Sequence, residues 1–199
     1  MEQFFTLYLK LFFMMTPFFV LSVFLSMGKR LSKPEKKSVI FKLAITVIVA
    51  SLTFLLFGKY IFSLFGITLD AFKIGAGTVL FLSALDMIRG DSELPATDSK
   101  KGADFAIVPL AIPSAVGPGM IGVLMVIGAE ISGFMDTFLV VLSLLAAVIS
   151  LVGVLFVSHK IQDLMGKQGL DILPKITGLF VSAIGAQIVF SGIQGFLFN

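Results

Sequence analysis

The chain has 199 residues, of which 57% are hydrophobic and only 14% are charged, and its mean hydropathy is +1.06. This balance is far from that of a soluble globular domain and indicates an all-helical, polytopic integral membrane protein with the lipid bilayer as its surroundings. The absence of cysteine excludes disulfide and thiolate chemistry. A net charge of +3 is too small to favour nucleic acid as a partner.

The length of the apolar segments predicts how many helices cross the bilayer. A hydrocarbon core about 30 Å thick needs about 20 helical residues. Six segments meet or approach this length, at residues 4–27, 39–65, 69–88, 105–129, 137–158 and 172–197. We therefore predict six transmembrane helices. The third segment is the weakest, because Lys73 and Asp86 lie inside it and must reach the interface or pair.

A polar stretch divides the chain almost in half. We predict a first three-helix repeat at residues 1–90, a cytoplasmic linker at residues 91–104 and a second three-helix repeat at residues 105–199. The halves resemble each other at an offset near one hundred residues, with Gly66 matching Gly166 and Gly77 matching Gly178. In this alignment Pro17 corresponds to Pro113 and Ser22 to Pro118. Because each half holds an odd number of helices, equivalent helices run in opposite directions, which predicts an inverted-topology repeat.

The positive charges predict an orientation. With the amino terminus outside, the inner loops collect twelve of the fifteen Lys and Arg residues. Under the positive-inside rule, both termini then lie on the non-cytoplasmic side of a bacterial inner membrane.

The stretch Pro109 to Gly119 holds three prolines and two glycines in a segment without charge. Each proline removes an amide donor, and lipid offers no water to the carbonyl groups set free. In small transporters such interrupted helices lie where the substrate binds, and exposed amides suit a carboxylate. The alternative is a packed kink. The candidate substrate-binding residues here are Pro113, Ser114, Gly117, Pro118 and Gly119.

The first and last helices add further candidates for substrate binding. Thr16, Pro17 and Ser22 predict a matching break in the first helix, although a simple kink explains them equally well. Gln187 lies in the middle of the last segment, where substrate contact and an interhelical hydrogen bond are both open.

Charged residues of the third segment are candidates for coupling or gating. Asp86 and Arg89 lie three residues apart on one helical face, so we expect an intrahelical pair at the interface, with a gate or proton relay as the alternative. We expect Lys73, the third such candidate, to snorkel to the surface. For Gly75, Gly77 and Gly178 we expect close helix packing.

Several of these motifs together resemble a known family. They are Phe72 to Gly77, Ala84 to Met87, the broken segment Val108 to Ile121, and Gly178, Gln187, Gly192 and Ile193 in the last helix. The pattern is similar, over the full length, to the MarC family of membrane proteins, which includes the SnatA-like neutral amino acid transporters. The resemblance implies six spans, outside termini and, in some members, transport of glycine and alanine. Members often carry Asp-Pro-Ile-Gly-Asn in the first helix, where this chain reads Thr16-Pro17-Phe18-Phe19-Val20.

We therefore expect an inner-membrane secondary transporter of small neutral amino acids or similar metabolites, with alternating access around interrupted helices one and four. Coupling to protons or sodium and a homo-oligomer are part of this hypothesis. We expect no enzyme activity, metal or cofactor, because the single His159 has no ligand partners nearby and no phosphate-binding loop occurs. The rivals are an intramembrane enzyme acting on lipid or prenyl substrates and a structural or assembly subunit.

Overall fold

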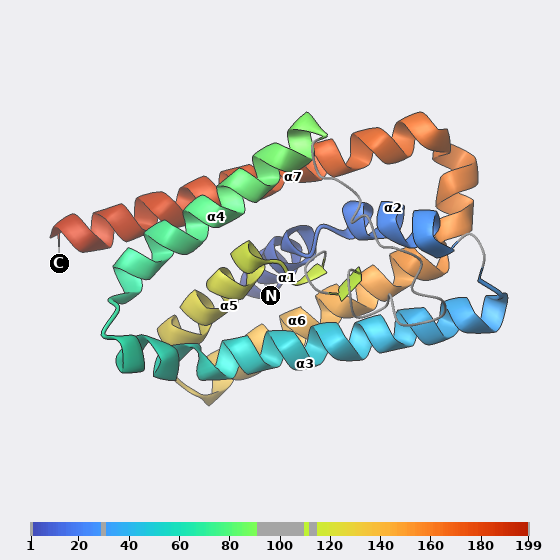
Figure 1. Cartoon of the computed structure of the whole chain (residues 1–199). Coiled ribbons are helices and arrows are strands. Elements are labelled where there is room, and N and C mark those ends of the chain that lie inside the picture. The colour runs from blue at the N-terminus through green and yellow to red at the C-terminus, as the bar shows by residue number, and fades with distance from the viewer. Residues whose placement is uncertain (1, 29–30, 91–109, 112–114, 199) are drawn as a thin grey trace.

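The computed structural model describes residues 2–28, 31–90, 110–111 and 115–198, and over these residues the chain is helical without any strand. The all-helical class predicted from the sequence is confirmed. The helices are α1 (Glu2–Met14), α2 (Pro17–Met27), α3 (Lys33–Phe65), α4 (Leu69–Arg89), α5 (Pro118–Glu130), α6 (Phe134–Phe156) and α7 (Ser158–Phe198), as Figure 1 shows.

Five helical stretches are long and apolar enough to cross a membrane: Glu2–Met27, Lys33–Gly58, Leu69–Arg89, Phe134–Phe156 and Gln168–Phe198. They match five of the six predicted spans and confirm a polytopic membrane protein. The fourth predicted span corresponds to α5, which has 13 residues and is therefore about 20 Å long, too short to cross the bilayer alone. Most of the fourth predicted span that precedes α5, and the whole predicted linker at residues 91–104, lie outside the described residues.

The helices form three layers (Figure 1). α4 and α7 pack together on one side and α3 and α6 on the other, while α1, α2 and α5 lie between them and contact both outer layers. The middle layer supplies many of the fully buried side chains, among them Leu11, Phe24 and Leu124. The outer helices carry exposed apolar side chains such as Phe134 and Ile149, which suit contact with lipid.

Helix contacts remain the same when the two halves are exchanged. α1 packs on α6 and α5 packs on α3, so the first span of each half contacts the second span of the other half. α4 packs on α5 while α7 packs on α1 and α2, so each third span contacts the other half's first span. α4 pairs with α7 and α3 with α6, and each of these pairs joins equivalent spans.

Glycines form the contact between α4 and α7. A Cβ atom on Gly77 would lie 2.9 Å from the carbonyl oxygen of Gly185, and one on Gly178 would lie 2.9 Å from that of Ala84. The two helices therefore meet backbone to backbone and run antiparallel, as expected for small residues at a membrane helix interface. The packing role predicted for Gly77 and Gly178 is confirmed. The same prediction was wrong for Gly75, which has no atom within 4 Å of such a Cβ and faces outward.

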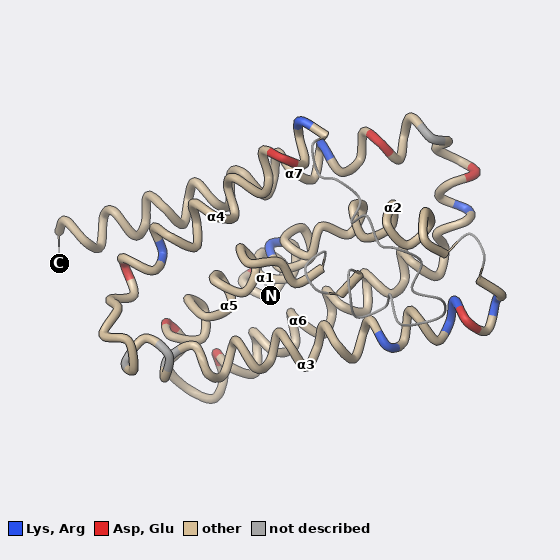
Figure 2. Tube along the Cα trace, viewed as in Figure 1, with Lys and Arg blue, Asp and Glu red and all other residues tan. Residues whose placement is uncertain are grey.

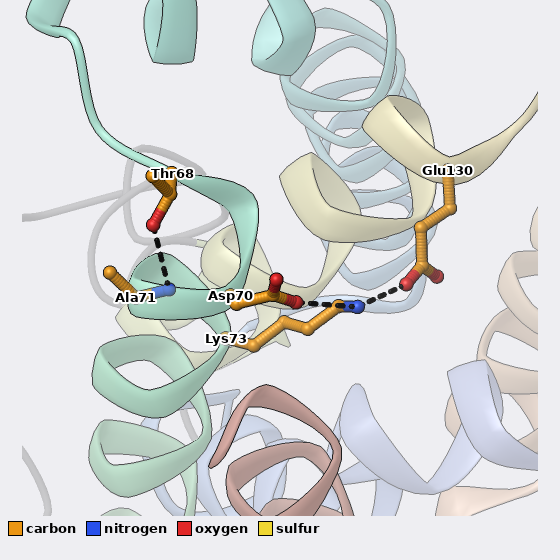
Figure 3. A network of polar contacts seen from close by, with 5 residues as sticks. All are labelled: Thr68, Asp70, Ala71, Lys73 and Glu130. Carbon is orange, nitrogen blue, oxygen red and sulfur yellow. Dashed lines mark hydrogen bonds and ion pairs between the residues drawn. The ribbon is translucent and has the colours of Figure 1, made fainter. Parts of the chain in front are cut away.

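Local signals explain where several helices begin and end. α3 begins after Ser32, whose amide and hydroxyl donate to the Glu35 carboxylate at 2.7 and 2.6 Å. It ends at Gly66, whose φ of 63° is left-handed, and the matching Gly166 kinks α7 with a φ of 62°. The Thr68 hydroxyl then caps α4 by accepting from the Ala71 amide at 3.3 Å (Figure 3).

Charged residues lie mainly towards the helix ends (Figure 2). At the end where α3 begins, the Lys36 ammonium lies 2.8 Å from His159 Nε2 near the start of α7. The opposite end carries Asp70, Glu130 and Asp136 at or near the termini of α4, α5 and α6. The long apolar stretches between these ends match the thickness of a bilayer core.

Candidate functional site

The first span is broken between α1 and α2. Thr16 has a left-handed backbone with φ 46° and ψ 55°, and its amide donates to the carbonyl oxygen of Phe13 at 2.9 Å. Pro17 follows as the first residue of α2, where its missing amide donor does no harm. Such a backbone costs a β-branched residue about 1–3 kcal/mol, so the surrounding structure must hold it in place. The interruption predicted at Thr16 and Pro17 is confirmed.

A second break precedes α5. The Val116 amide donates to the carbonyl oxygen of Ala111 at 2.8 Å, a five-residue spacing that forms a wide, π-type turn. Gly117 then takes an extended backbone with φ −78° and ψ 172°, and Pro118 is the first residue of the helix. The helix geometry leaves the amides of the first turn without intrahelical acceptors. Two predicted candidates, Pro113 and Ser114, lie outside the described residues.

The two breaks correct the alignment of the halves. Pro17 and Pro118 each start a helix directly after a break, and they are 101 residues apart. The same offset relates Lys33 to Phe134, the first residues of α3 and α6. By this offset Pro17 aligns with Pro118, whereas the sequence alignment placed it opposite Pro113, which lies outside the described residues. Apolar residues repeat too uniformly along such helices to fix the register, whereas helix starts fix it directly.

Gly119 lies in the contact between α5 and α4. A Cβ atom there would lie 2.8 Å from Leu80 Cα and 2.7 Å from its Cδ1. Close packing therefore accounts for this glycine on that side, and the side facing Leu80 has no room for a ligand.

A wide cavity of about 410 Å³ lies where α4 ends and α7 leaves its kink. It brings together predicted residues Ser22 and Arg89 with two that were not predicted, Asp171 and Lys175. The Ser22 hydroxyl is directed to the carbonyl oxygens of Phe18 at 3.0 Å and Leu170 at 3.4 Å, which ties α2 to α7 at the cavity wall. Ser22 thus lines this cavity, more than one helical turn after the break at Thr16.

The expected pair of Asp86 and Arg89 does not form. Ion pairs within the described part of the chain join Lys73 to Asp70 and to Glu130, and Asp86 and Arg89 are both exposed on α4. Arg89 lies in the last helical turn and faces the wide cavity instead.

A narrow cavity of about 120 Å³ lies at the other end of the α4–α7 pair. Its polar lining comes from four helices: Lys10 of α1, Lys73 of α4, Glu130 of α5, and Gln187 and Ser191 of α7. Val123, Val126, Ile127 and Ile188 complete it.

Lys73 is held by carboxylates at this cavity. Its ammonium lies 2.7 Å from Glu130 Oε1 and 3.5 Å from Asp70 Oδ1 (Figure 3). The sequence left snorkelling and pairing open for the charges of this segment; Lys73 is paired, because α5 ends beside it and supplies a counterion. Sequence reasoning also missed Lys10 and Glu130; the signal available was a lone lysine inside the first apolar segment.

The linings of the two cavities share a constant offset along the chain. Four residues of the narrow cavity lie 101 positions from residues of the wide one, namely Val123 from Ser22, Ile188 from Met87, Ser191 from Gly90 and Lys73 from Pro174. The wide cavity lies at the α4 carboxyl end and the narrow one at its amino end. About 21 Å separates Lys73 from Met87 along α4, at 1.5 Å per residue.

Helices long and apolar enough to cross a bilayer, two helix breaks and a glycine contact between α4 and α7 define a polytopic α-helical membrane protein with a cavity at each end of α4. A family model described as MarC family integral membrane protein matches residues 1–197, and the chain belongs to this family. It is 35% identical to a UPF0056 membrane protein of Methanocaldococcus jannaschii, over 99% of this chain and 98% of that protein. A UPF0056 membrane protein of Pyrococcus abyssi is 31% identical, over 98% of this chain and 96% of that protein. The UPF0056 membrane protein YvbG of Bacillus subtilis is 28% identical, over 94% of this chain and 92% of that protein. No solved structure matches the chain.

Proposed function

We propose that the protein is a secondary transporter of small neutral amino acids or similar metabolites. The observation that carries this proposal is the pair of helix breaks at Pro17 and Pro118, both within the middle layer of the bundle. An interrupted helix leaves backbone groups unpaired, which a membrane protein tolerates where the segment is enclosed by protein or lines a cavity. Two such segments at equivalent positions are typical of transporter folds.

The halves act as an inverted-topology repeat in this proposal. Support comes from the helix contacts, which are unchanged when the halves are exchanged, and from the constant offset between Pro17 and Pro118 and between Gly77 and Gly178. Alternating access then means that the halves rock about the α4–α7 contact, so that the cavities at its two ends open in turn. The two cavities have volumes of about 410 and 120 Å³.

The substrate class rests on the family and on backbone chemistry. The first-turn amides of α5 and the positive end of its dipole suit the carboxylate of an amino acid. Gly117 has no side chain and precedes these amides in an extended backbone, and Thr16 and Pro17 form the other break. Coupling to protons or sodium remains part of the proposal, with Asp86 as its candidate.

The orientation follows from the described basic residues. Lys36, Lys160, Arg89 and Lys175 lie on α3, α7 and α4 at the end that holds the wide cavity. The positive-inside rule directs this end to the cytoplasm and both termini to the other side of the inner membrane.

The test is transport by purified protein in proteoliposomes, measured as uptake of radiolabelled glycine and alanine. Gly117→Leu should abolish uptake, because its side chain fills the space next to the α5 amides. Gly153→Leu is the matched control: a Cβ atom at Gly153 has no neighbour within 4 Å, so uptake should persist. Wild-type uptake by Gly117→Leu, with both variants inserted equally, would place the site elsewhere. A wild-type protein that transports neither solute contradicts the amino acid assignment.

A further inference from the structure

Lys10 is a basic residue inside the first apolar stretch. It lies eight residues into α1, or about 12 Å from the helix start at 1.5 Å per residue, and is partly buried. Over residues 2–28, 31–90, 110–111 and 115–198, its ammonium has no hydrogen-bond partner and no carboxylate within 4 Å. Glu130 acts on it electrostatically from a greater distance. An ammonium group held away from water in this way favours an anionic partner.

Glu130 has binding capacity left on the other side of the cavity. Its Oε1 is taken by Lys73 at 2.7 Å, but its side chain is 50% exposed and a carboxylate offers about four acceptor positions. Asp70 also binds Lys73, so the positive charge of that lysine is shared between two carboxylates. Within the part of the chain that the structure describes, the cavity therefore presents a Lys10 ammonium group with no direct ion pair and a Glu130 carboxylate with acceptor positions left.

The size of the cavity restricts its ligand. A cavity of about 120 Å³ has room for a small solute. A solute with only a few heavy atoms fits. A ligand that satisfies both Lys10 and Glu130 in so small a space carries a negative and a positive group close together.

We propose that the narrow cavity is a recognition site for a small zwitterion, in which Lys10 binds the carboxylate and Glu130 binds the ammonium group. The inference rests on the proposed transport function and deepens it. The narrow cavity lies at the opposite end of α4 from the wide cavity beside Ser22 and Met87. The ammonium of the bound solute competes with Lys73 for Glu130, so occupation of the site loosens the contact between α4 and α5.

The test measures equilibrium binding of radiolabelled glycine to the purified full-length protein, with acetate as a competitor that lacks the ammonium group. Lys10→Met and Glu130→Gln should each weaken glycine binding about tenfold or more, as loss of one charged partner does. Acetate should displace glycine from the wild type. With Gly117→Leu added to remove the carboxylate site proposed at the start of α5, direct binding of radiolabelled acetate should survive in Glu130→Gln and be lost in Lys10→Met. Lys160→Met and Asp136→Asn are the matched controls, because both side chains are exposed and lie outside the cavity.

Folding of each variant is followed by circular dichroism melting and gel filtration. Unchanged glycine affinity in folded Lys10→Met or Glu130→Gln, in a protein that still transports, overturns the site and leaves the transport function intact. Binding that depends on Lys10 in a wild-type protein that moves no solute across proteoliposomes supports the site and overturns the transport function. If the wild type binds neither glycine, alanine nor acetate saturably, the site is overturned.

Discussion

The Lys73 ammonium of α4 lies 2.7 Å from a carboxylate oxygen of Glu130 at the end of α5, and this ion pair forms one wall of the narrow cavity. Lys73 is only 12% exposed, whereas Glu130 is half exposed, so solvent weakens the attraction and the pair contributes little to overall stability. Its effect is local: it holds two helices together at one end of the bundle.

Removing this pair should open the narrow cavity. In a chain without native cysteine, Val126→Cys places a single thiol at a buried position of the cavity lining. Adding Lys73→Met should raise its rate of reaction with a water-soluble maleimide severalfold. Val181→Cys, equally buried but outside this lining, is the control and should stay unreactive. Equal rates with and without Lys73 would show that the ion pair does not close the cavity.

The glycine contact between α4 and α7 should be intolerant of larger residues. A Cβ atom at Gly185 would lie 2.8 Å from the Phe81 amide nitrogen and 3.0 Å from the Gly77 carbonyl oxygen. Gly185→Val should therefore destabilise the protein by about 1–3 kcal/mol or more through overpacking, seen as a lower melting temperature in detergent. Gly75→Val on the outer face of α4 should leave α4–α7 packing unchanged. A similar loss in both variants would point to helix propensity as the cause.

The kink at Gly166 makes a second stability prediction. Its backbone, with φ 62° and ψ −172°, lies in a region that essentially only glycine adopts. Gly166→Ala should cost about 1–3 kcal/mol although no atom lies within 4 Å of the added Cβ. Gly153→Ala, also in open space but inside α6, should instead stabilise by about 0.5–1 kcal/mol. Melting curves of the two variants should shift in opposite directions.

The orientation can be tested with single cysteines near the start of α6, at Asp136, and just beyond its end, at Lys160 in α7. Helix α6 has 23 residues and spans about 33 Å, so Asp136 and Lys160 are expected on opposite sides of the membrane. In intact cells, an impermeant thiol reagent should label Asp136→Cys and reach Lys160→Cys only after permeabilisation. The reverse pattern would show the opposite membrane orientation and contradict the one proposed from the basic residues.

Local signals in the sequence predicted more of this molecule than distant contacts did. The breaks at Thr16 and Gly117 followed from proline chemistry, which acts on the neighbouring turn whatever surrounds it. The pairing of Lys73 with Glu130 joins residues 57 positions apart on different helices, and nothing in either segment specifies it. Lys10 was visible as a charge in an apolar stretch, but its position beside Glu130 depends on how α1, α4, α5 and α7 enclose one space.

The glycine contact has a consequence for movement. Gly178, Gly185 and Gly192 recur every seven residues along α7, and each meets the backbone or the first side-chain atoms of α4. At these positions the glycine has no side chain of its own to hold the neighbouring helix, so one helix can shear against the other with little change of rotamer. Elsewhere in the bundle, buried side chains such as Phe24 and Leu144 are closely packed between helices and resist sliding of one helix along another. The α4–α7 contact is therefore the place in the bundle where two helices can slide most easily, whereas the other helix contacts resist sliding.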